Sequence, residues 1–305
     1  MERPSIRHLE TLVAVADHGS FRKAATSLGM SQPALSAQVQ SAEHLLGVQV
    51  FERDRRSVLI TPAGEDVVGR AREALAAVDS VSDAARRRGE PLVGALRLGV
   101  IPTVAPYWLP ALLPRVRSAF PRLELILRED QTNRLLAQLG AGQLDAALLA
   151  IPIAGDYTTA EIARERFVLA APKGSPLTKK KRVADSDLDE ATVLLLEDGH
   201  CLRDQALAVC DRGGAVESMG MRATSLPTLV QMVAGGLGVT LLPEAAADAL
   251  VQARGPIDLA EFAAPPPGRT LGLAWRTSSA RLREFRLLAE TMRGAADSFL
   301  VKLRA

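Results

Sequence analysis

The sequence predicts an α/β protein: an all-α winged helix-turn-helix at the amino end, then one linker helix, then a large domain of two Rossmann-like lobes. Three observations predict this organisation. Short helical patterns separated by glycine turns fill roughly the first sixty residues. A helix-forming stretch without Gly or Pro follows between Gly69 and Gly89. Beyond residue 92, strand patterns alternate with helix patterns, which is typical of parallel sheets with covered faces.

Composition narrows the class of protein. A chain of 305 residues with 48% hydrophobic residues is long enough for two or three domains with their own cores, and its net charge of +2 does not by itself indicate a polyanion-binding protein. There is no signal peptide at Met1 and no apolar run of membrane-spanning length, so we expect a cytoplasmic protein with no membrane partner. Neither Cys-x-x-Cys nor His-Glu-x-x-His spacing occurs, so we expect no metal site and no cofactor.

Apolar residues at helical spacing predict a first helix over residues 6–17. A second helix is predicted over 21–28, and after a tight turn at Gly29 a third helix runs over 31–47. The third helix has Pro33 in its first turn, where a missing N–H has no cost. Helix, short glycine-containing turn and well-capped helix together are typical of a helix-turn-helix.

This region carries side chains suited to double-stranded DNA. Short or amide side chains at the start of the third helix could reach base edges in a major groove. Residues 50–60 predict two short strands around a basic turn, a wing whose arginines would lie against phosphate. The residues predicted to contact DNA are Arg22, Lys23, Ser31, Gln32, Pro33, Ser36, Gln38, Arg53, Arg55 and Arg56. From Ser20 to Ile60, five basic residues face three acids, a net of +2, so a helix-turn-helix that never contacts DNA is the alternative.

The next helix begins at Pro62, with Thr61 as its cap. Small apolar residues recur along it at alternating spacings of four and three, as in the seam of a two-stranded coiled coil: Val67, Ala71, Ala74, Val78, Val81 and Ala85. We interpret residues 62–91 as a dimerising linker that ends in a polar hinge. Packing on its own domain is the alternative, which we disfavour because no neighbouring apolar segment is evident. A dimer would also present paired helices to paired DNA half-sites.

The rest of the chain predicts two lobes joined by crossovers, with a cleft at the carboxyl ends of the strands. The domain limits are then 1–61, 62–91 and 92–305, with lobe I at about 92–165 and 269–305 and lobe II at about 166–268. Strands are expected over residues 95–100, 123–129, 145–150, 167–171, 192–196, 221–224, 238–242 and 270–275. Helices are expected over residues 107–120, 132–139, 226–234 and 280–303, the last returning to lobe I.

Both cysteines, Cys201 and Cys210, lie on one further helix-friendly segment. Nine residues at ~100° each place two side chains on opposite faces of a helix, roughly 13 Å apart along its axis. A disulfide requires Cα atoms within about 7 Å. The two thiols therefore cannot bond unless the helix comes apart, which is the physical description of a redox switch.

Several segments resemble a known family. The amino-terminal sixty residues closely resemble LysR-type transcriptional regulators in the order and spacing of Phe21-Arg22-Lys23-Ala24-Ala25, Ser31-Gln32-Pro33-Ala34-Leu35-Ser36, Leu45-Leu46-Gly47 and Phe51-Glu52-Arg53. Ala42, where the family usually has leucine, is a departure. The two lobes are similar to the family's effector domain, which resembles periplasmic binding proteins. The segment from Asp198 to Ala206, with Cys210, resembles the family's peroxide-sensing OxyR subfamily.

The resemblance implies a role for each residue of a sensor site. Cys201 would be the peroxidatic thiolate in the first turn of its helix, and Cys210 the resolving thiol, with Gly213-Gly214 as slack. The site residues that would assist them are His200 and Arg203, through positive charge or hydrogen bonds, Thr103 and Thr132, which would hold the peroxide, and Arg269, which would complete the polar lining. The ordinary alternatives are a helix cap for Thr132, a loop-shaping role for Thr103 and a surface position for Arg269.

The expected function is therefore a peroxide-sensing DNA-binding regulator of the oxidative stress response, activator or repressor, and not an enzyme. Its expected partners are double-stranded DNA half-sites, hydrogen peroxide, further copies of the chain in a homodimer and homotetramer, RNA polymerase and a thiol reductant. One alternative is a LysR-type regulator with inert cysteines that responds to a metabolite in the cleft. The other is a thiol peroxidase, which the attached DNA-reading unit argues against.

Overall fold

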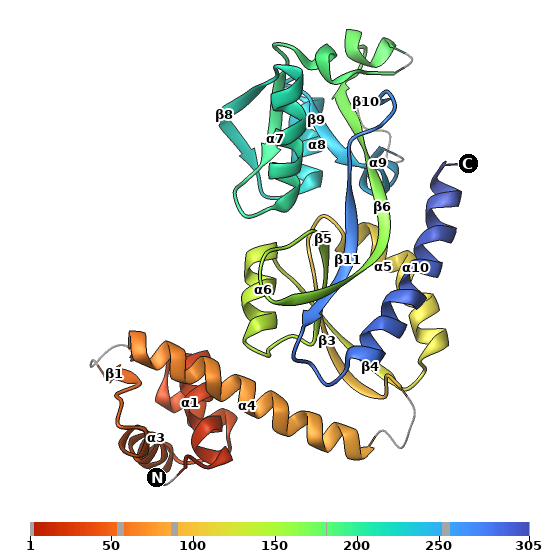
Figure 1. Cartoon of the computed structure of the whole chain (residues 1–305). Coiled ribbons are helices and arrows are strands. Elements are labelled where there is room, and N and C mark those ends of the chain that lie inside the picture. Colours follow the sequence, from red (N-terminus) through yellow and green to blue (C-terminus); the bar gives the residue numbers. More distant parts are fainter. Residues whose placement is uncertain (1–2, 54–57, 87–90, 181, 252–256, 305) are drawn as a thin grey trace. The chain divides into compact units, whose positions relative to one another are not determined.

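The computed structural model describes residues 3–53, 58–86, 91–180, 182–251 and 257–304 of the chain. The chain folds into two compact units, the first ending near Glu90 and the second beginning at Pro91 (Figure 1).

The first unit opens with three helices followed by a β-hairpin. Its elements are α1 (Ile6–His18), α2 (Phe21–Ser27), α3 (Gln32–Leu46), β1 (Phe51–Arg53) and β2 (Val58–Ile60). Ser20 and Ser31 cap α2 and α3, since their side chains accept hydrogen bonds from the backbone N–H groups of Lys23 and Ala34. The two strands pair antiparallel, so the predicted wing strands are present. The wing's turn, residues 54–57, lies outside the described part of the chain.

Buried side chains fasten α3 to the wing. Ala42, the position that departs from the family pattern, is fully buried in the core of the unit. Its neighbour Glu43 accepts hydrogen bonds from the backbone N–H groups of Val50 (2.8 Å) and Phe51 (3.0 Å). A carboxylate on α3 therefore fixes where β1 begins.

The linker helix α4 (Pro62–Arg86) begins as predicted, with Thr61 accepting a hydrogen bond from the Gly64 N–H at 2.9 Å. Its first half packs on α1: Ala71 is buried, and Arg72 forms an ion pair with Asp17. The expectation that no apolar segment lies beside this helix is therefore wrong for its first half. Farther along, Val78 is 39% and Val81 is 71% exposed, so the second half of the predicted seam is uncovered.

The second unit contains one seven-stranded sheet and one pair of parallel strands. The long sheet has the order β10-β6-β11-β5-β3-β4, with β9 also paired to β6, while β7 pairs with β8. Its strands are β3 (Gly94–Val100), β4 (Leu123–Glu129), β5 (Ala146–Ile151), β6 (Tyr157–Pro172), β9 (Thr240–Pro243), β10 (Ile257–Glu261) and β11 (Gly268–Arg276). The pair is β7 (Thr192–Leu196) and β8 (Val216–Ala223).

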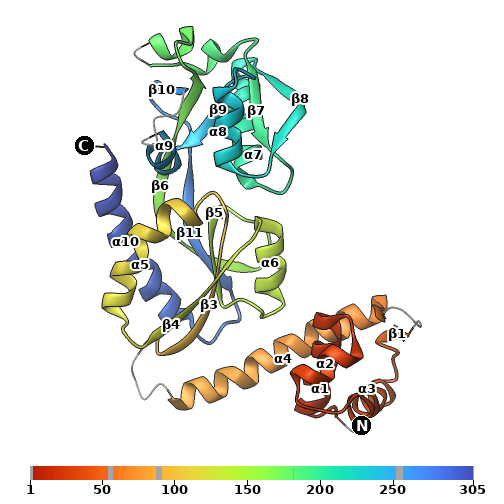
Figure 2. The ribbon, with the colours of Figure 1, turned by 180° about the vertical axis from the view of Figure 1, so that it is seen from behind.

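The expected all-parallel sheets are mixed instead. β3 is parallel to β4 and β5, but β11 is antiparallel to β5 and to β6. β6 pairs with β11 over residues 157–166, in lobe I, and with β9 and β10 over residues 167–172, in lobe II (Figures 1 and 2). This one strand of sixteen residues therefore runs through both lobes.

Helices cover both faces of the lobe I sheet, with α5 and α10 on one side and α6 on the other (Figure 2). The helices of this unit are α5 (Ala105–Ala119), α6 (Thr132–Gly140), α7 (Cys201–Gly213), α8 (Leu226–Ala234), α9 (Glu244–Val251) and α10 (Leu282–Arg304), with short 3₁₀ turns η1 (Pro176–Lys179) and η2 (Asp185–Leu188). Phe285, Leu288 and Met292 of α10 are buried in lobe I as predicted. No helix within the described ranges is long and apolar enough to span a membrane.

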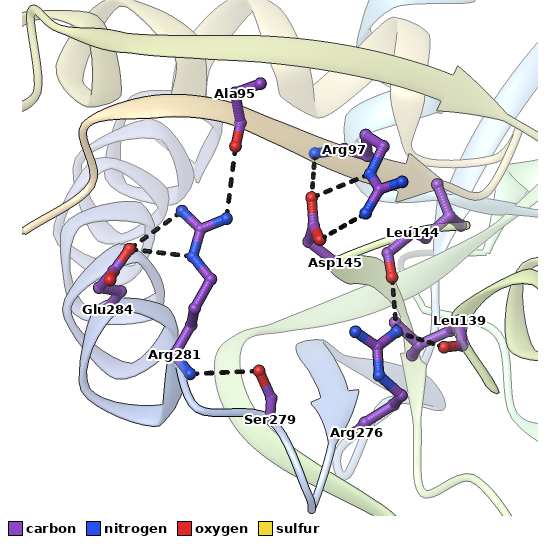
Figure 3. A network of polar contacts seen from close by, with 9 residues as sticks. All are labelled: Ala95, Arg97, Leu139, Leu144, Asp145, Arg276, Ser279, Arg281 and Glu284. Carbon is purple, nitrogen blue, oxygen red and sulfur yellow. Dashed lines mark hydrogen bonds and ion pairs between the residues drawn. The ribbon is translucent and has the colours of Figure 1, made fainter. Parts of the chain in front are cut away.

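Polar contacts fix the far end of α6 in lobe I (Figure 3). Arg276, at the end of β11, donates hydrogen bonds to the carbonyl oxygens of Leu139 (2.5 Å) and Leu144 (2.7 Å). A cation at the carboxyl end of a helix satisfies carbonyl groups that have no partner within the helix. Because α6 is held there, its opposite end, which carries Thr132, has a fixed position.

Candidate functional site

Two hydroxyl groups lie beyond the carboxyl ends of neighbouring strands. β3 and β4 are parallel, with Val100 opposite Glu129 at their last residues. Thr103 and Thr132 each follow three residues later, Thr103 just before α5 and Thr132 as the first residue of α6. Both therefore sit at the sheet edge where ligands bind in open α/β folds.

Thr103 is held by an arginine from β11. Arg269 donates from Nη1 to the Thr103 hydroxyl (2.7 Å) and from Nη2 to its carbonyl oxygen (3.0 Å). Both residues are only 3% exposed. Arg269 is therefore not a surface residue, and Thr103 does more than shape a loop.

Glu165 on β6 balances the charge of Arg269, and sequence reasoning missed it. The two residues are directly opposite in the β6–β11 ladder, and Arg269 Nε donates to Glu165 Oε2 at 2.8 Å. The second carboxylate oxygen accepts from Trp108 Nε1 (2.9 Å) and from the backbone N–H of Ala245 (3.3 Å). Nothing local to Glu165 indicates this pairing, since its partner is 104 residues away.

The hydroxyl of Thr132 is buried and has no hydrogen-bond partner among the described residues. The first α6 bond runs from the Leu135 N–H to the Gln131 carbonyl, so the Thr132 side chain does not cap its helix. A buried polar group without a partner is uncommon in proteins and calls for an explanation, such as an unseen water or a ligand.

The second lobe meets this sheet edge through the loop before α7. Gln131 donates from Nε2 to the Asp198 carbonyl at 3.5 Å, and a Cβ at Gly199 would lie 2.5 Å from Gln131 Oε1. Gly199 has a φ of +94°, which favours glycine. This contact brings the start of α7 to lobe I, where the partly buried Cys201 packs against the core.

Cys201 is the first residue of α7, in the first turn of its helix as expected. The N-cap is His200, not Asp198 or Gly199 as expected, and no side chain caps the helix. Burial lowers the pKa of His200, with the Glu197 carboxylate acting in the opposite direction. His200 is therefore neutral at neutral pH, so of the two expected contributions, positive charge or hydrogen bonds, it can offer hydrogen bonds.

Cys210 has a different environment on the same helix. It is buried in the core of lobe II, and both cysteines are free thiols. Burial, with a smaller effect from the Asp211 carboxylate, raises the pKa of Cys210 to about 11. At neutral pH this group is a protonated thiol and hence a weak nucleophile.

Arg203 belongs to a ring of alternating charges. Its Nη2 is 2.8 Å from Glu217 Oε1 and its Nε is 3.2 Å from Asp198 Oδ1. Arg222 on β8 contacts the same two carboxylates, at 2.8 Å from Asp198 and 3.4 Å from Glu217. The charge of Arg203 is thus balanced by carboxylates, while Asp204 is exposed and forms no ion pair within the described part of the chain.

The carboxyl end of α7 is packed tightly. A Cβ at Gly213 would lie 2.2 Å from the carbonyl oxygen of Asp185, and Arg212 Nε donates to the Asp185 carboxylate at 2.9 Å. Gly214 ends the helix in the left-handed conformation. In the thiol form Gly213 therefore permits close packing on η2, and the slack that these glycines would give on oxidation stays a prediction.

Two family models match the chain. The model described as bacterial regulatory helix-turn-helix protein, lysR family, matches residues 6–65, and the LysR substrate binding domain matches residues 89–297. The chain belongs to the LysR-type transcriptional regulators. No group of His, Cys, Asp and Glu that could hold a metal ion occurs among the residues that the structure describes.

Within the LysR-type regulators, the chain falls in the OxyR subfamily. A probable hydrogen peroxide-inducible genes activator from Mycobacterium leprae is 46% identical over 94% of this chain and 93% of its own length. A full-length OxyR variant from Pseudomonas aeruginosa superimposes with a TM-score of 0.80 at 34% identity, covering 95% of this chain and 98% of its own. A Corynebacterium glutamicum OxyR mutant, solved with H2O2 bound, gives 0.68 at 36% identity, covering 100% and 98%.

The structure describes the side chains of most of the residues predicted to contact DNA in this LysR-type regulator. Arg22, Lys23, Gln32 and Pro33 are exposed at the starts of α2 and α3, and Ser31 is exposed while its hydroxyl caps α3. Ser36 and Gln38 are half-buried. The Arg53 side chain and all of Arg55 and Arg56 lie outside the described part of the structure.

Proposed function

We propose that this LysR-type regulator senses hydrogen peroxide with Cys201 and reports it by a Cys201–Cys210 disulfide. The observation that carries the proposal is the separation of the two thiols: they share α7, but one packs on the lobe I core and the other lies inside the lobe II core. A disulfide cannot form without rearranging α7. Oxidation of the thiols is therefore coupled to a change of fold.

The first step takes place at Cys201. Its thiolate attacks one oxygen of H2O2: an S–O bond forms, the O–O bond breaks, and the second oxygen leaves as hydroxide, which is protonated to water. The sulfur loses two electrons and becomes a sulfenic acid. The buried Thr132 hydroxyl without a partner and the Thr103 hydroxyl offer hydrogen bonds to the peroxide, and Arg269 holds Thr103. The H2O2-bound relative supports this choice of ligand.

The second step brings in Cys210. Its thiol attacks the Cys201 sulfur: an S–S bond forms, the S–O bond breaks, and water leaves. Because Cys210 is a buried, protonated thiol in the reduced form, it has to leave the lobe II core before it reacts. The roles are thus unequal: Cys201 is peroxidatic and Cys210 resolving. A thiol reductant would restore the dithiol.

The readout is a changed assembly on DNA. Residues 1–61 form the DNA-binding domain, residues 62–91 the dimerising linker and residues 92–305 the sensor of this proposal, assembled as a homodimer and homotetramer. The uncovered Val78 and Val81 on α4 support the dimerising role. Paired α3 helices would read paired half-sites of double-stranded DNA, and contacts with RNA polymerase would follow from the bound arrangement.

Mass spectrometry of the digested protein after about one equivalent of H2O2 tests the chemistry. We expect an intramolecular Cys201–Cys210 disulfide in the wild type, a sulfenic acid that dimedone traps at Cys201 in Cys210→Ser, and an unmodified Cys210 in Cys201→Ser. If the wild type forms no disulfide, the proposal fails.

DNA binding separates this proposal from its rivals. Peroxide should alter the footprint of the wild type on its operator and leave that of Cys201→Ser unchanged. A regulator whose cysteines are inert and whose cleft binds a metabolite would behave differently. Its footprint would be the same with and without peroxide, in the wild type and in Cys201→Ser. The family consists of transcriptional regulators and not enzymes, so peroxide should be consumed once for each switching event and not in repeated turnover.

A further inference from the structure

The bonding of Thr103 fixes the direction of its hydroxyl hydrogen. A hydroxyl carries one hydrogen and two lone pairs, whereas a guanidinium only donates. Since Arg269 Nη1 donates to Thr103 Oγ1 at 2.7 Å, the hydroxyl hydrogen must point away from Arg269. The Thr103 backbone carbonyl also accepts from Arg269, which holds the guanidinium against this residue at two points. Thr103 is thereby left as a donor toward its surroundings at the sheet edge.

Arg269 can do this only if its own orientation is fixed. Three of its nitrogens take part in hydrogen bonds, Nε to Glu165 and the two Nη atoms to Thr103. The guanidinium is planar, so fixing Nε fixes the directions of both Nη atoms. Gly268, the residue before Arg269, allows the strand to approach Glu165 closely: a Cβ there would lie 2.4 Å from the Glu165 carbonyl oxygen.

Glu165 in turn is held by three other elements. Its oxygens accept from Arg269 on β11, Trp108 on α5 and the first turn of α9 at Ala245. Its side chain and that of Arg269 are fully buried, so neither charge is stabilised by water. Strands β6 and β11 and helices α5 and α9 therefore converge on one buried carboxylate.

We propose that Glu165 is a positioning residue of the peroxide site: by orienting Arg269, it fixes the Thr103 hydroxyl as a hydrogen-bond donor to the reacting peroxide. The inference rests on the proposed peroxide chemistry of Cys201. Negative charge develops on the oxygen that leaves as hydroxide, and a donor already aimed at that oxygen stabilises it without reorganising. Glu165 contributes through geometry, and it touches neither the peroxide nor the thiol.

The test compares two reagents on one thiol, in reduced protein. Glu165→Gln keeps the size of the side chain but replaces one acceptor oxygen with an NH2 donor. That donor would face N–H groups that now donate to Glu165, either that of Arg269 or those of Trp108 and Ala245. We expect the second-order rate of Cys201 oxidation by H2O2 to fall about 10- to 100-fold, the loss typical of a misplaced catalytic group. The rate of Cys201 alkylation by iodoacetamide, which needs no hydroxyl donor, should stay within about twofold of wild type.

A double-mutant cycle shows whether Glu165 acts through Thr103. Thr103→Val removes the hydroxyl, and Thr103→Ser keeps it. If the relay holds, Glu165→Gln slows the reaction with H2O2 in the wild-type and Thr103→Ser backgrounds but adds little in Thr103→Val. Equal effects of Glu165→Gln in all three backgrounds would overturn the relay, since a merely structural role does not depend on that hydroxyl.

Glu284→Gln is the matched control. Glu284 is another buried glutamate of the same lobe, paired with Arg281 at 2.9 Å and away from the sheet edge (Figure 3). The Glu284→Gln variant should leave the rate of Cys201 oxidation by H2O2 unchanged.

A second variant is needed if Glu165→Gln fails to fold, which would be seen as rapid alkylation of Cys210. Arg269→Lys then tests the same relay, because it retains the charge opposite Glu165 but cannot donate to both Thr103 atoms. Normal H2O2 rates in the folded variants would refute the inference, whereas a wild type that does not react would refute the proposed function instead.

Discussion

Cys201 and Cys210 share one helix but belong to different hydrophobic cores, Cys201 packing on that of lobe I and Cys210 lying inside that of lobe II. Each thiol is thus part of the packing that stabilises the reduced fold. In the proposed switch, breaking the helix to join them exposes part of one core or the other. We expect the energy needed for this to oppose the disulfide and to set how readily the protein is oxidised.

The buried thiol of Cys210 should make the reduced protein less stable in alkali. Its pKa is about 11 in the fold, against an ordinary 9.0. The unfolded chain therefore loses this proton first, so the stabilisation is complete below about pH 9 and is lost as the pH rises toward 11, by about 2–3 kcal/mol. Urea unfolding in reductant between pH 8 and 11 measures this. Cys210→Ala, which lacks the thiol, should show a shallower slope, and parallel curves would contradict the assignment.

The charge ring around Arg203 should oppose oxidation. It joins the turn that carries Cys201, through Asp198 and Arg203, to the strand that follows Cys210, through Glu217 and Arg222. Whichever end of α7 moves, some of these ion pairs are lost. Partly exposed pairs contribute about 0.2–1 kcal/mol each. Arg222→Gln should therefore shift the thiol–disulfide equilibrium in a glutathione buffer a few-fold toward the disulfide.

Two controls separate this effect from a general effect of charge. High salt should shift the wild type in the same direction as Arg222→Gln and should have less effect on the variant. Arg182→Gln removes an exposed cation of lobe II that pairs with Glu261 at 3.9 Å, away from the ring. It should leave the equilibrium unchanged, and an equal shift there would rule out a specific role for the ring.

Gly213→Ala should destabilise the reduced fold even though alanine is the better helix former. Helix propensity favours alanine by up to about 1 kcal/mol. The added Cβ would lie 2.2 Å from the backbone carbonyl of Asp185, which cannot rotate away. Overpacking of this kind costs about 1–3 kcal/mol, which outweighs the gain in helix propensity. Thermal unfolding of the reduced protein measures the difference, and an unchanged or higher melting temperature would show that α7 is not packed on η2 in this way.

Local signals in the sequence predict much of the fold. The limits of β4, β7 and α8 match the prediction, because each segment has apolar residues at strand or helix spacing and is bounded by turn or capping residues. α9 and β10 were not predicted, and β6 was predicted too short. The first half of β6, from Tyr157 to Arg166, contains many polar residues and is a strand only because it pairs with β11, over a hundred residues away. Pairing of this kind leaves no local pattern.

In the candidate site, too, residues with a local sequence signal were predicted and residues that depend on distant contacts were not. The thiol pair is evident from spacing, and Thr103, Thr132 and Arg269 were found by resemblance to a family. Glu165 and the Arg222–Glu217 side of the charge ring were not found, since their roles depend on contacts with residues of other elements. His200 was expected to contribute positive charge or hydrogen bonds, and only its burial reveals that its pKa is lowered.

The helix-turn-helix predicts two different DNA-binding defects. Lys23 is exposed at the start of α2 and Gln32 at the start of α3. We expect Lys23 to contact phosphate and Gln32 to contact a base edge. Lys23→Ala should weaken binding to all duplexes and lower the slope of log K against log salt by about 1 for each lysine in contact. Gln32→Ala should keep that slope but lose discrimination between sites.

Anisotropy titrations over a range of salt concentrations, on a selected operator and on a random-sequence duplex, distinguish the two defects. Arg182→Gln removes a cation outside the first unit and should match wild type. If Lys23→Ala alters site preference while Gln32→Ala alters only the salt slope, the assigned roles of α2 and α3 are reversed.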